Sequence, residues 1–247
     1  MTPETKEAPP VRQPPPTWSV RRVNRFLSTF ENSQYLEVGV STGRTFFDVV
    51  ADRKVAVDPR FKFDVKKHEK DGVEFHSITS DAYFDALPVG TKFDVVFLDG
   101  LHTFEQTYRD LLNTLIHTHD GSVILIDDTV PSDVYSAMPD HLRSREFRQR
   151  DGSTRNGWHG DTYKVVFAIH DFAPSLCYRT LLGRGNFQTL VWRGKSQPRK
   201  PIFDNLEKIS RLTYFDMFEH DHVFQRLDET AALEECLAAL GKAATPG

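Results

Sequence analysis

Several features that would assign a chain to a specialised class are missing from this sequence. Its 247 residues include only two cysteines, Cys177 and Cys236, and no Cys-x-x-Cys pair. This argues against a disulfide scaffold and a zinc cluster, and it fits a reducing cytoplasm. Apolar runs such as residues 95–98 have the length of a strand and are far too short to cross a bilayer. We therefore expect a cytoplasmic protein with no membrane partner.

An excess of one charge is also missing. The formal net charge is −4, with no basic stripe and no long acidic block, so we expect no nucleic-acid partner. Residues 1–7 lack the apolar core of a secretory signal. Residues 1–17 hold six prolines and almost no large apolar side chains, which predicts a disordered or draped arm.

What the chain does contain is an alternation of apolar runs with helical spacing. Parallel strands buried on both faces are predicted at 34–38, 54–57, 73–77, 93–98 and 122–126, and an antiparallel hairpin at 176–182 and 187–193. Helices are predicted from Trp18 onward and at 44–51, 80–87, 103–116 and 161–170. This order predicts an α/β fold, an open doubly wound sheet of seven strands that ends in the hairpin.

Residues 202–240 follow the hairpin and have an amphipathic helical pattern. Leu206, Ile209, Leu212 and Phe215 fall on one side. We expect this helical extension either to cover the sheet or to form a subunit contact, which would make the protein a homo-oligomer.

The most informative stretch is Tyr35-Leu36-Glu37-Val38-Gly39-Val40-Ser41-Thr42-Gly43, an apolar run that ends in an acid and enters a glycine turn. A second apolar run ends at Asp58. Two strand ends, a glycine turn and a second acid are what a nucleoside-binding crevice of a doubly wound sheet requires. Compared with the dinucleotide fingerprint G-x-G-x-x-G, Ser41 and Arg44 replace the second and third glycines, so a pyrophosphate could not approach the backbone as closely.

Glu37 adds negative charge where a diphosphate would lie and therefore favours a cationic ligand. S-adenosylmethionine carries an amino group and a sulfonium but no phosphate, and it fits this requirement. Asp58, at the second strand end, is placed to accept both ribose hydroxyls. Ser80 and Asp81 begin a helix after the third strand, where they either lie near the adenine or cap the helix.

The residues from Gly39 to Gly43 also spell G-x-S-x-G, the nucleophile elbow of α/β-hydrolases. An elbow usually follows several strands, whereas this turn follows the first. A hydrolase with Ser41 as nucleophile is therefore a lesser alternative, which chain order alone does not exclude.

Acidic residues follow the next two predicted strands: Asp99 after the fourth, and Asp127 and Asp128 after the fifth. Adjacent strand ends face one crevice, so these carboxylates are expected to converge beside the cofactor. Such oxygen ligands suit Mg²⁺, and a hydroxyl bound to that ion loses its proton more readily. His102 follows closely and is the candidate general base. The local alternatives are a turn at Asp99, a helix cap at His102 and loop chemistry at the acid pair.

Four segments, 36–43, 56–59, 93–100 and 121–128, resemble the class I S-adenosylmethionine-dependent methyltransferases. The resemblance covers roughly residues 34–193 and implies the Rossmann-like methyltransferase fold. It implies that Glu37 and the turn formed by Gly39, Ser41, Thr42 and Gly43 hold the methionine part of the cofactor, that Asp58 holds the ribose, that Ser80 and Asp81 are candidates for the adenine, and that Asp99 lies beside the cofactor.

Residues 99–111 resemble a narrower group, the metal-dependent macrolide sugar O-methyltransferases of the macrocin type. This implies metal ligands at Asp99, Asp127 and Asp128 and a base at His102. Catechol-type enzymes have an Asp-Asn pair after the fifth strand, and Asp128 stands at the place of that asparagine. Many relatives have no metal.

The resulting hypothesis is an O-methyltransferase acting on a hydroxyl of a small molecule or sugar, assisted by Mg²⁺. The alternatives are a metal-independent methyltransferase acting on another nucleophile, and a nucleoside-binding module without catalysis. We divide the chain into the arm (1–17), an S-adenosylmethionine-binding methyltransferase domain (18–195) and the helical extension (196–247).

A long polar loop is predicted at 129–157. It is expected to close over the acceptor, with Trp158 or His159 touching it. Five arginines make the loop basic and predict a solvated surface, with an anionic acceptor as the minor alternative: Arg143, Arg145, Arg148, Arg150 and Arg155. Asp161 is predicted to cap the helix at 161–170.

Overall fold

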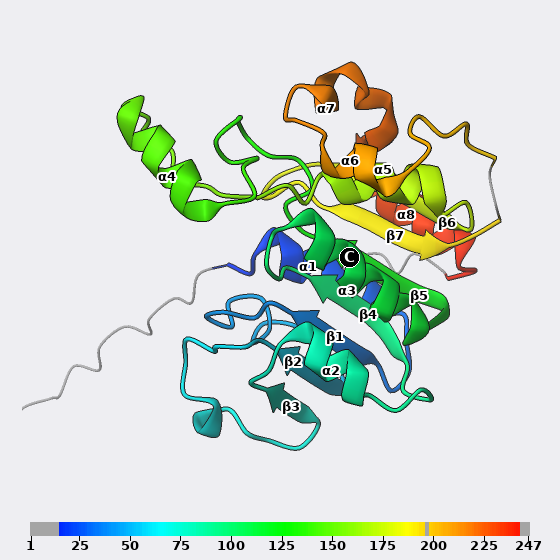
Figure 1. Cartoon of the computed structure of the whole chain (residues 1–247). Coiled ribbons are helices and arrows are strands. Elements are labelled where there is room, and N and C mark those ends of the chain that lie inside the picture. The colour runs from blue at the N-terminus through cyan, green and yellow to red at the C-terminus, as the bar shows by residue number, and fades with distance from the viewer. Residues whose placement is uncertain (1–14, 196–197, 243–247) are drawn as a thin grey trace, which may run out of the picture.

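The computed structural model describes residues 15–195 and 198–242. Its centre is an eight-stranded sheet in the order β3-β2-β1-β4-β5-β7-β6-β8 (Figure 1). The strands are β1 (Gln34–Val38), β2 (Arg53–Val57), β3 (Val73–His76), β4 (Phe93–Leu98), β5 (Thr118–Ile126), β6 (Leu176–Leu182), β7 (Thr189–Arg193) and β8 (Leu227–Asp228). Strands β1 to β5 are parallel, and β7 runs antiparallel to both β5 and β6.

The predicted α/β fold, with an open doubly wound sheet and a terminal hairpin, is confirmed. The sheet has eight strands rather than seven because the two-residue β8 pairs with β6, with Leu227 opposite Leu181. Most of the arm predicted at 1–17 lies outside the described residues, and the division of the chain after residue 195 remains a prediction.

Hydrophobic cores lie on both faces of the sheet, which explains the continuous apolar runs. Leu36 and Val96 belong to the first core, and their neighbours Tyr35 and Val95 belong to the second. The first is covered by α2 (Ser80–Ala86), α3 (Phe104–Ile116) and α5 (Lys164–Phe172). The second is covered by α1 (Trp18–Leu27) and α8 (Glu229–Ala239). No helix among residues 15–195 and 198–242 has the length and hydropathy to cross a membrane.

The helical extension contributes to the first core. It begins with α6 (Leu206–Ser210), α7 (Asp216–Glu219) and the 3₁₀ helix η2 (Asp221–Phe224). Ile209, Leu212 and Phe224 are buried in the core, whereas Phe215 on the predicted apolar side is exposed. The extension therefore covers the first core with α6 to η2 and the second core with α8, and a subunit contact remains a prediction.

Two local predictions were wrong. Residues 44–51 form turns rather than a helix, since the Lys54 ammonium takes the carbonyls of Phe46 and Val49 at 2.7 and 2.8 Å. The segment 129–157, predicted as a loop, contains α4 (His141–Arg150), which projects away from the sheet (Figure 1). Asp140 caps this helix by accepting from the backbone N–H groups of residues 142 and 143. The short 3₁₀ helix η1 (Val65–Lys67) occupies the polar stretch after β2.

Candidate active site

Two cavities open at the carboxyl ends of the central strands. The central cavity, of about 540 Å³, is lined by residues that follow β1, β2, β4 and β5, including Ser41, Asp58, His102 and Asp128. The side cavity, of about 380 Å³, is lined by Glu37, Thr42 and Asp127 together with the start of α1. Gly39, Ser41, Asp99 and Asn186 line both cavities. This is the switch point of the sheet order, where doubly wound folds bind their ligands.

The glycine turn brings β1 and β4 into direct backbone contact. Gly39 has a φ of +90°, and a Cβ at this position would lie 1.9 Å from the carbonyl oxygen of Asp99. Ser41 also has a positive φ, of 50°. The Ser41 N–H donates to the Asp58 carboxylate at 2.8 Å, so the turn and the second strand end hold each other. Gly43 closes the turn by donating its N–H to the Val40 carbonyl at 2.8 Å.

Glu37 is buried against the side cavity. The Tyr35 hydroxyl donates to its carboxylate at 2.6 Å. Burial raises the pKa of Glu37 to about 8, and the charges of Asp127 and Asp58 add to the shift. A buried carboxylate without a cation is costly, so this position suits a cationic ligand group.

The predicted nucleoside residues have different partners. Asp58 lines the central cavity and accepts backbone N–H groups from Ser41 and Arg60 at 2.8 and 2.7 Å. Ser80 also lines the cavity. The Asp81 carboxylate instead accepts from Arg109 at 2.9 Å.

The alternative that Ser80 or Asp81 caps α2 is wrong. The N-cap is Thr79, whose hydroxyl accepts from the Ala82 N–H. Asp110, which sequence reasoning missed, lines the cavity, and burial raises its pKa. The helical spacing of α3 gave no signal for it.

Three of the four residues predicted to bind the metal or act as the base lie close together. One ligand atom each from Asp99, His102 and Asp128 lies within 4.8 Å of the others. His102 Nδ1 is 3.1 Å from Asp128 Oδ2, and His102 Nε2 is 3.7 Å from Asp99 Oδ1. Two carboxylates thus flank one imidazole at the wall of the central cavity.

Asp127 is not part of this group. Its carboxylate faces the side cavity, where it accepts from Gln188 Nε2 at 3.2 Å and from the Asp128 N–H at 2.9 Å. Burial and the neighbouring Asp128 raise the pKa of Asp127 to about 7. The two adjacent acids therefore serve different cavities.

The backbone around the group is strained. His102 and Asp128 both have a φ of 57°, an uncommon conformation for residues with a side chain. Gly160 approaches so closely that a Cβ would lie 1.6 Å from the His102 carbonyl oxygen. Such strain clusters at functional sites, where the surrounding structure holds it in place.

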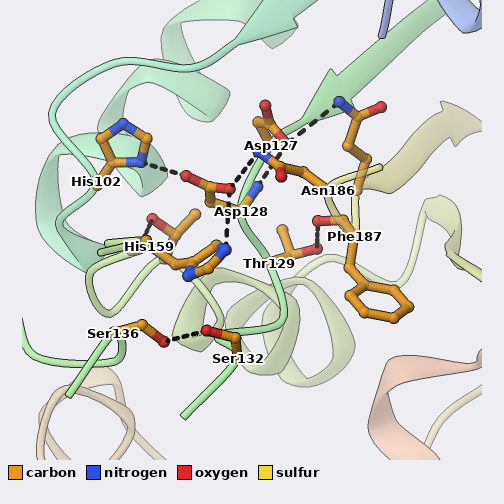
Figure 2. A network of polar contacts seen from close by, with 12 residues as sticks. His102, Asp127, Asp128, Thr129, Ser132, Ser136, His159, Asn186 and Phe187 are labelled. Atoms are coloured by element: carbon orange, nitrogen blue, oxygen red, sulfur yellow. Dashed lines mark hydrogen bonds and ion pairs between the residues drawn. The ribbon is translucent and has the colours of Figure 1, made fainter. Parts of the chain in front are cut away.

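Side chains from two further segments reach Asp128 (Figure 2). Asn186 Nδ2, from the turn of the β6–β7 hairpin, donates to Asp128 Oδ1 at 3.0 Å. His159 Nε2 lies 3.6 Å from the same oxygen, and burial lowers the pKa of His159. His159 was expected to touch the acceptor, whereas the sequence identified Asn186 only as a turn residue.

The buried Arg22 of α1 donates hydrogen bonds to the turn of the β6–β7 hairpin. Its guanidinium donates to the Asn186 carbonyl at 3.1 Å and to Gln188 Oε1 at 2.9 Å, and it pairs with Glu229 of α8 at 2.5 Å. Gln188 in turn donates to Asp127. The contacts of Arg22 join residues more than 150 positions apart, for which the sequence carries no local signal.

Asp161 was predicted to cap its own helix, and this was wrong. The helix α5 begins at Lys164, and the Asp161 carboxylate accepts from the Phe104 N–H at 2.8 Å. It therefore caps α3, the helix that follows His102.

Residues 36–129 match a family model described as a methyltransferase domain. The match includes the glycine turn, Asp58, Asp99, His102 and both residues of the acid pair. No sequence among the curated proteins matches the chain.

Several solved structures are similar to this chain. An O-methyltransferase from Bacillus cereus in complex with SAH has a TM-score of 0.50 and 16% identity, over 74% of this chain and 84% of that chain. The O-methyltransferase TomG from Streptomyces achromogenes, in complex with SAM, has a TM-score of 0.42 and 15% identity, over 70% and 78%. An SAH-bound methyltransferase from Podospora anserina has a TM-score of 0.45 and 13% identity, over 65% and 71%.

The Bacillus cereus protein shares the Rossmann-like methyltransferase fold. The family model places a methyltransferase domain on the strands and turns that build the site. A methyltransferase-domain model thus matches the segment that builds the site, and the chain has the Rossmann-like fold of the methyltransferase to which it is similar.

Proposed function

We propose that the protein transfers the methyl group of S-adenosylmethionine to a hydroxyl of a small molecule or sugar, with His102 as general base and a divalent ion held by Asp99 and Asp128. The observation that carries this proposal is the position of His102 between these two acids at the wall of the central cavity. The similar Bacillus cereus protein is described as an O-methyltransferase, which supports oxygen as the acceptor atom.

The donor set fits a divalent cation. Burial and the charges of Asp127 and Asp128 raise the pKa of Asp99 well above its usual range. A bound cation would relieve this crowding of buried carboxylates. Asp99 and Asp128 would supply the oxygen ligands that Mg²⁺ and Mn²⁺ prefer. When bound, such an ion lowers the pKa of a coordinated hydroxyl.

The side chains themselves position the proton transfer. Asp128 Oδ2 lies 3.1 Å from His102 Nδ1, and in the proposed mechanism this contact orients the ring so that Nε2 takes the proton of the acceptor hydroxyl. The acceptor oxygen then attacks the methyl carbon in line as the carbon–sulfur bond breaks and the neutral demethylated cofactor leaves. Glu37 holds the cationic methionine part, and Asp58 holds the ribose. Most of the rate gain comes from this positioning.

Asp127 was expected to be the third metal ligand. In the proposed arrangement it balances cofactor charge in the side cavity together with Glu37. This division explains why two consecutive acids follow β5.

A metal-independent methyltransferase is the second candidate. The contact between His102 Nδ1 and Asp128, at 3.1 Å, already forms a histidine–carboxylate pair without an ion. Such a pair is sufficient to orient a general base. The Ser41 hydroxyl, by contrast, makes no hydrogen bond to a histidine or acid within residues 15–195 and 198–242, so nothing there favours the hydrolase alternative.

The test is transfer of labelled methyl from S-adenosylmethionine to mixtures of hydroxylated sugars and phenols, before and after exhaustive chelation. Activity that is lost on chelation and restored by Mg²⁺ or Mn²⁺ supports the first candidate. Full activity after chelation supports the second. Calorimetry supplies the control, because tight NADH binding without binding of S-adenosylmethionine or its demethylated product would overturn both candidates.

A further inference from the structure

The helix α4 and the segment that follows it enclose a further cavity, of about 370 Å³. We call it the α4 cavity. The residues that line it include three arginines and no acid. Among them are Arg145, Arg148, Arg155, His141, Ser144 and Trp158. The positive potential of such a cavity favours an anionic ligand group.

Arg148 is the buried member of this lining. Its Nη2 donates to Asp133 Oδ1 and to the Gly157 carbonyl, both at 2.8 Å. The residue is only 4% exposed, yet its Nε and Nη1 are buried without a hydrogen-bond partner. Buried donors are normally satisfied, so two open donors on a residue that lines a cavity point to a missing acceptor.

The acid that pairs with two of these arginines does not cancel their charge. Asp133 contacts Arg148 at 2.8 Å and Arg155 at 3.9 Å. One carboxylate thus faces two guanidinium groups, and Arg145 adds a third positive charge to the lining.

Trp158 forms the wall between the α4 cavity and the central cavity, since it lines both. Its ring centroid lies 5.3 Å from that of His102 and 4.8 Å from that of His141. The indole N–H donates to the Met138 carbonyl at 2.7 Å, which fixes the ring. The two cavities are thus neighbours, and a group of the acceptor that extends past Trp158 would enter the α4 cavity.

We propose that the α4 cavity binds an oxyanion carried by the acceptor, such as a phosphate, sulfate or carboxylate group. The identification of this ligand as part of the acceptor rests on the proposed function, whereas the anion site itself does not. Guanidinium groups present paired donors that match oxyanions in geometry and charge. The basic segment thus has two parts: Arg145, Arg148 and Arg155 line the cavity, while Arg143 and Arg150 are exposed and are not among its lining residues.

The first test is calorimetry on the full chain saturated with S-adenosylhomocysteine, at low ionic strength. The probes are inorganic pyrophosphate, phosphate, sulfate and citrate, and their ranking separates the three oxyanion sources. We expect saturable binding that weakens at least about tenfold in the double variant Arg145→Gln/Arg155→Gln, because charge-assisted hydrogen bonds are lost.

The matched control is the double variant Arg143→Gln/Arg150→Gln, which removes the same charge from the same basic segment. All four arginines are exposed, so neither variant threatens the core. Binding within about twofold of wild type is expected for the control. Equal losses in both variants, or no saturable binding in the wild-type protein, would overturn the anion site.

A second measurement separates this inference from the proposed function. For a methylated acceptor, Arg145→Gln/Arg155→Gln should raise KM about tenfold or more and leave kcat nearly unchanged. If all methylated acceptors are neutral and the variant has normal KM, the inference fails and the O-methyltransferase stands. If the anions bind as expected but no hydroxyl is methylated, the proposed function fails and the anion site stands.

Discussion

The proposed cofactor end and the proposed reaction end of the crevice are built from different kinds of groups. At the cofactor end, the Gly39 turn contacts the Asp99 carbonyl, and the Ser41 N–H donates to Asp58, so backbone groups define the shape. At the reaction end, His102, His159 and Asn186 reach Asp128 with side chains from three separate segments. A backbone-built site depends on local conformation, whereas a side-chain-built site depends on how distant segments pack.

This difference leads to a general expectation for variants. Substitutions at the cofactor end should act through conformation and affect folding and cofactor affinity together. Substitutions at the reaction end should affect turnover or ion binding and leave cofactor affinity nearly intact. The following predictions test that contrast.

The largest effect is expected for Gly39→Ala. The new Cβ would meet the Asp99 carbonyl at 1.9 Å in a backbone with positive φ. We expect the free energy of unfolding to fall by more than about 3 kcal/mol and cofactor binding to be lost. Gly90→Ala is the control, because its Cβ would have no atom within 4 Å. Chemical denaturation and calorimetry measure both, and a normal dissociation constant for Gly39→Ala would contradict the backbone-built description.

His102→Ala should lower turnover by about 10²- to 10⁴-fold, since general-base catalysis contributes an effect of that size. Its affinity for S-adenosylhomocysteine should stay within about twofold of wild type, because the proposed mechanism gives the imidazole no part in holding the cofactor. His222→Ala, at an exposed site in η2, serves as the control. Steady-state kinetics with an identified acceptor decide the matter, and wild-type turnover in His102→Ala would remove His102 from the mechanism.

The neighbours Asp127 and Asp128 provide a matched pair. Asp128→Asn should weaken Mn²⁺ binding by about 10- to 100-fold, since it removes a proposed ligand. Asp127→Asn should change Mn²⁺ affinity much less and instead weaken binding of S-adenosylmethionine, because its carboxylate faces the side cavity. Electron paramagnetic resonance of Mn²⁺ and calorimetry separate the two. Equal effects on Mn²⁺ would mean that both acids bind the ion, as the sequence predicted.

The smallest effect is a pH dependence of cofactor affinity. Burial raises the pKa of Glu37 to about 8, so below that pH the free protein must lose a proton before its carboxylate can hold a cation. Affinity for S-adenosylmethionine should therefore rise with pH, by about tenfold per unit between pH 6 and 7, and level off near pH 8. Glu37→Gln should bind more weakly and show a flat profile. A flat profile in the wild-type protein would exclude a role for Glu37 ionisation.

Much of the fold followed from local patterns. The strands at 34–38, 93–98 and 176–182 were predicted with the same bounds as observed. The first two belong to the parallel sheet, whose buried strands favour apolar runs, and the third was marked by the turn of its hairpin. The helix expected at 44–51 failed because Lys54, from the next strand, takes the carbonyls that a helix would use. The α4 helix was missed because its sequence, His141 to Arg150, has no apolar stripe that would mark a helix packed on a core.

In the candidate site, the residues at strand ends were predictable from the sequence, and the residues from distant segments were not. His102 and the acids at the strand ends were identified because parallel strands bring their carboxyl ends to one edge. Asn186 was missed because a turn sequence does not specify the group that its side chain will face. The cap that Asp161 supplies to α3 was also unpredictable, since it joins positions 57 residues apart.

The chain alone therefore determined the parallel sheet, the glycine turn and the acids that end β1, β2, β4 and β5, because each of these is encoded by a few consecutive residues. Only the tertiary structure decided that Asp127 and Asp128 serve different cavities, that Asn186 and His159 join Asp128, and that Trp158 separates the central cavity from an arginine-lined one. The physical reason is that side-chain partners depend on strand register and on the close approach of segments such as Gly160 to His102, and these arise only when distant parts of the chain pack together.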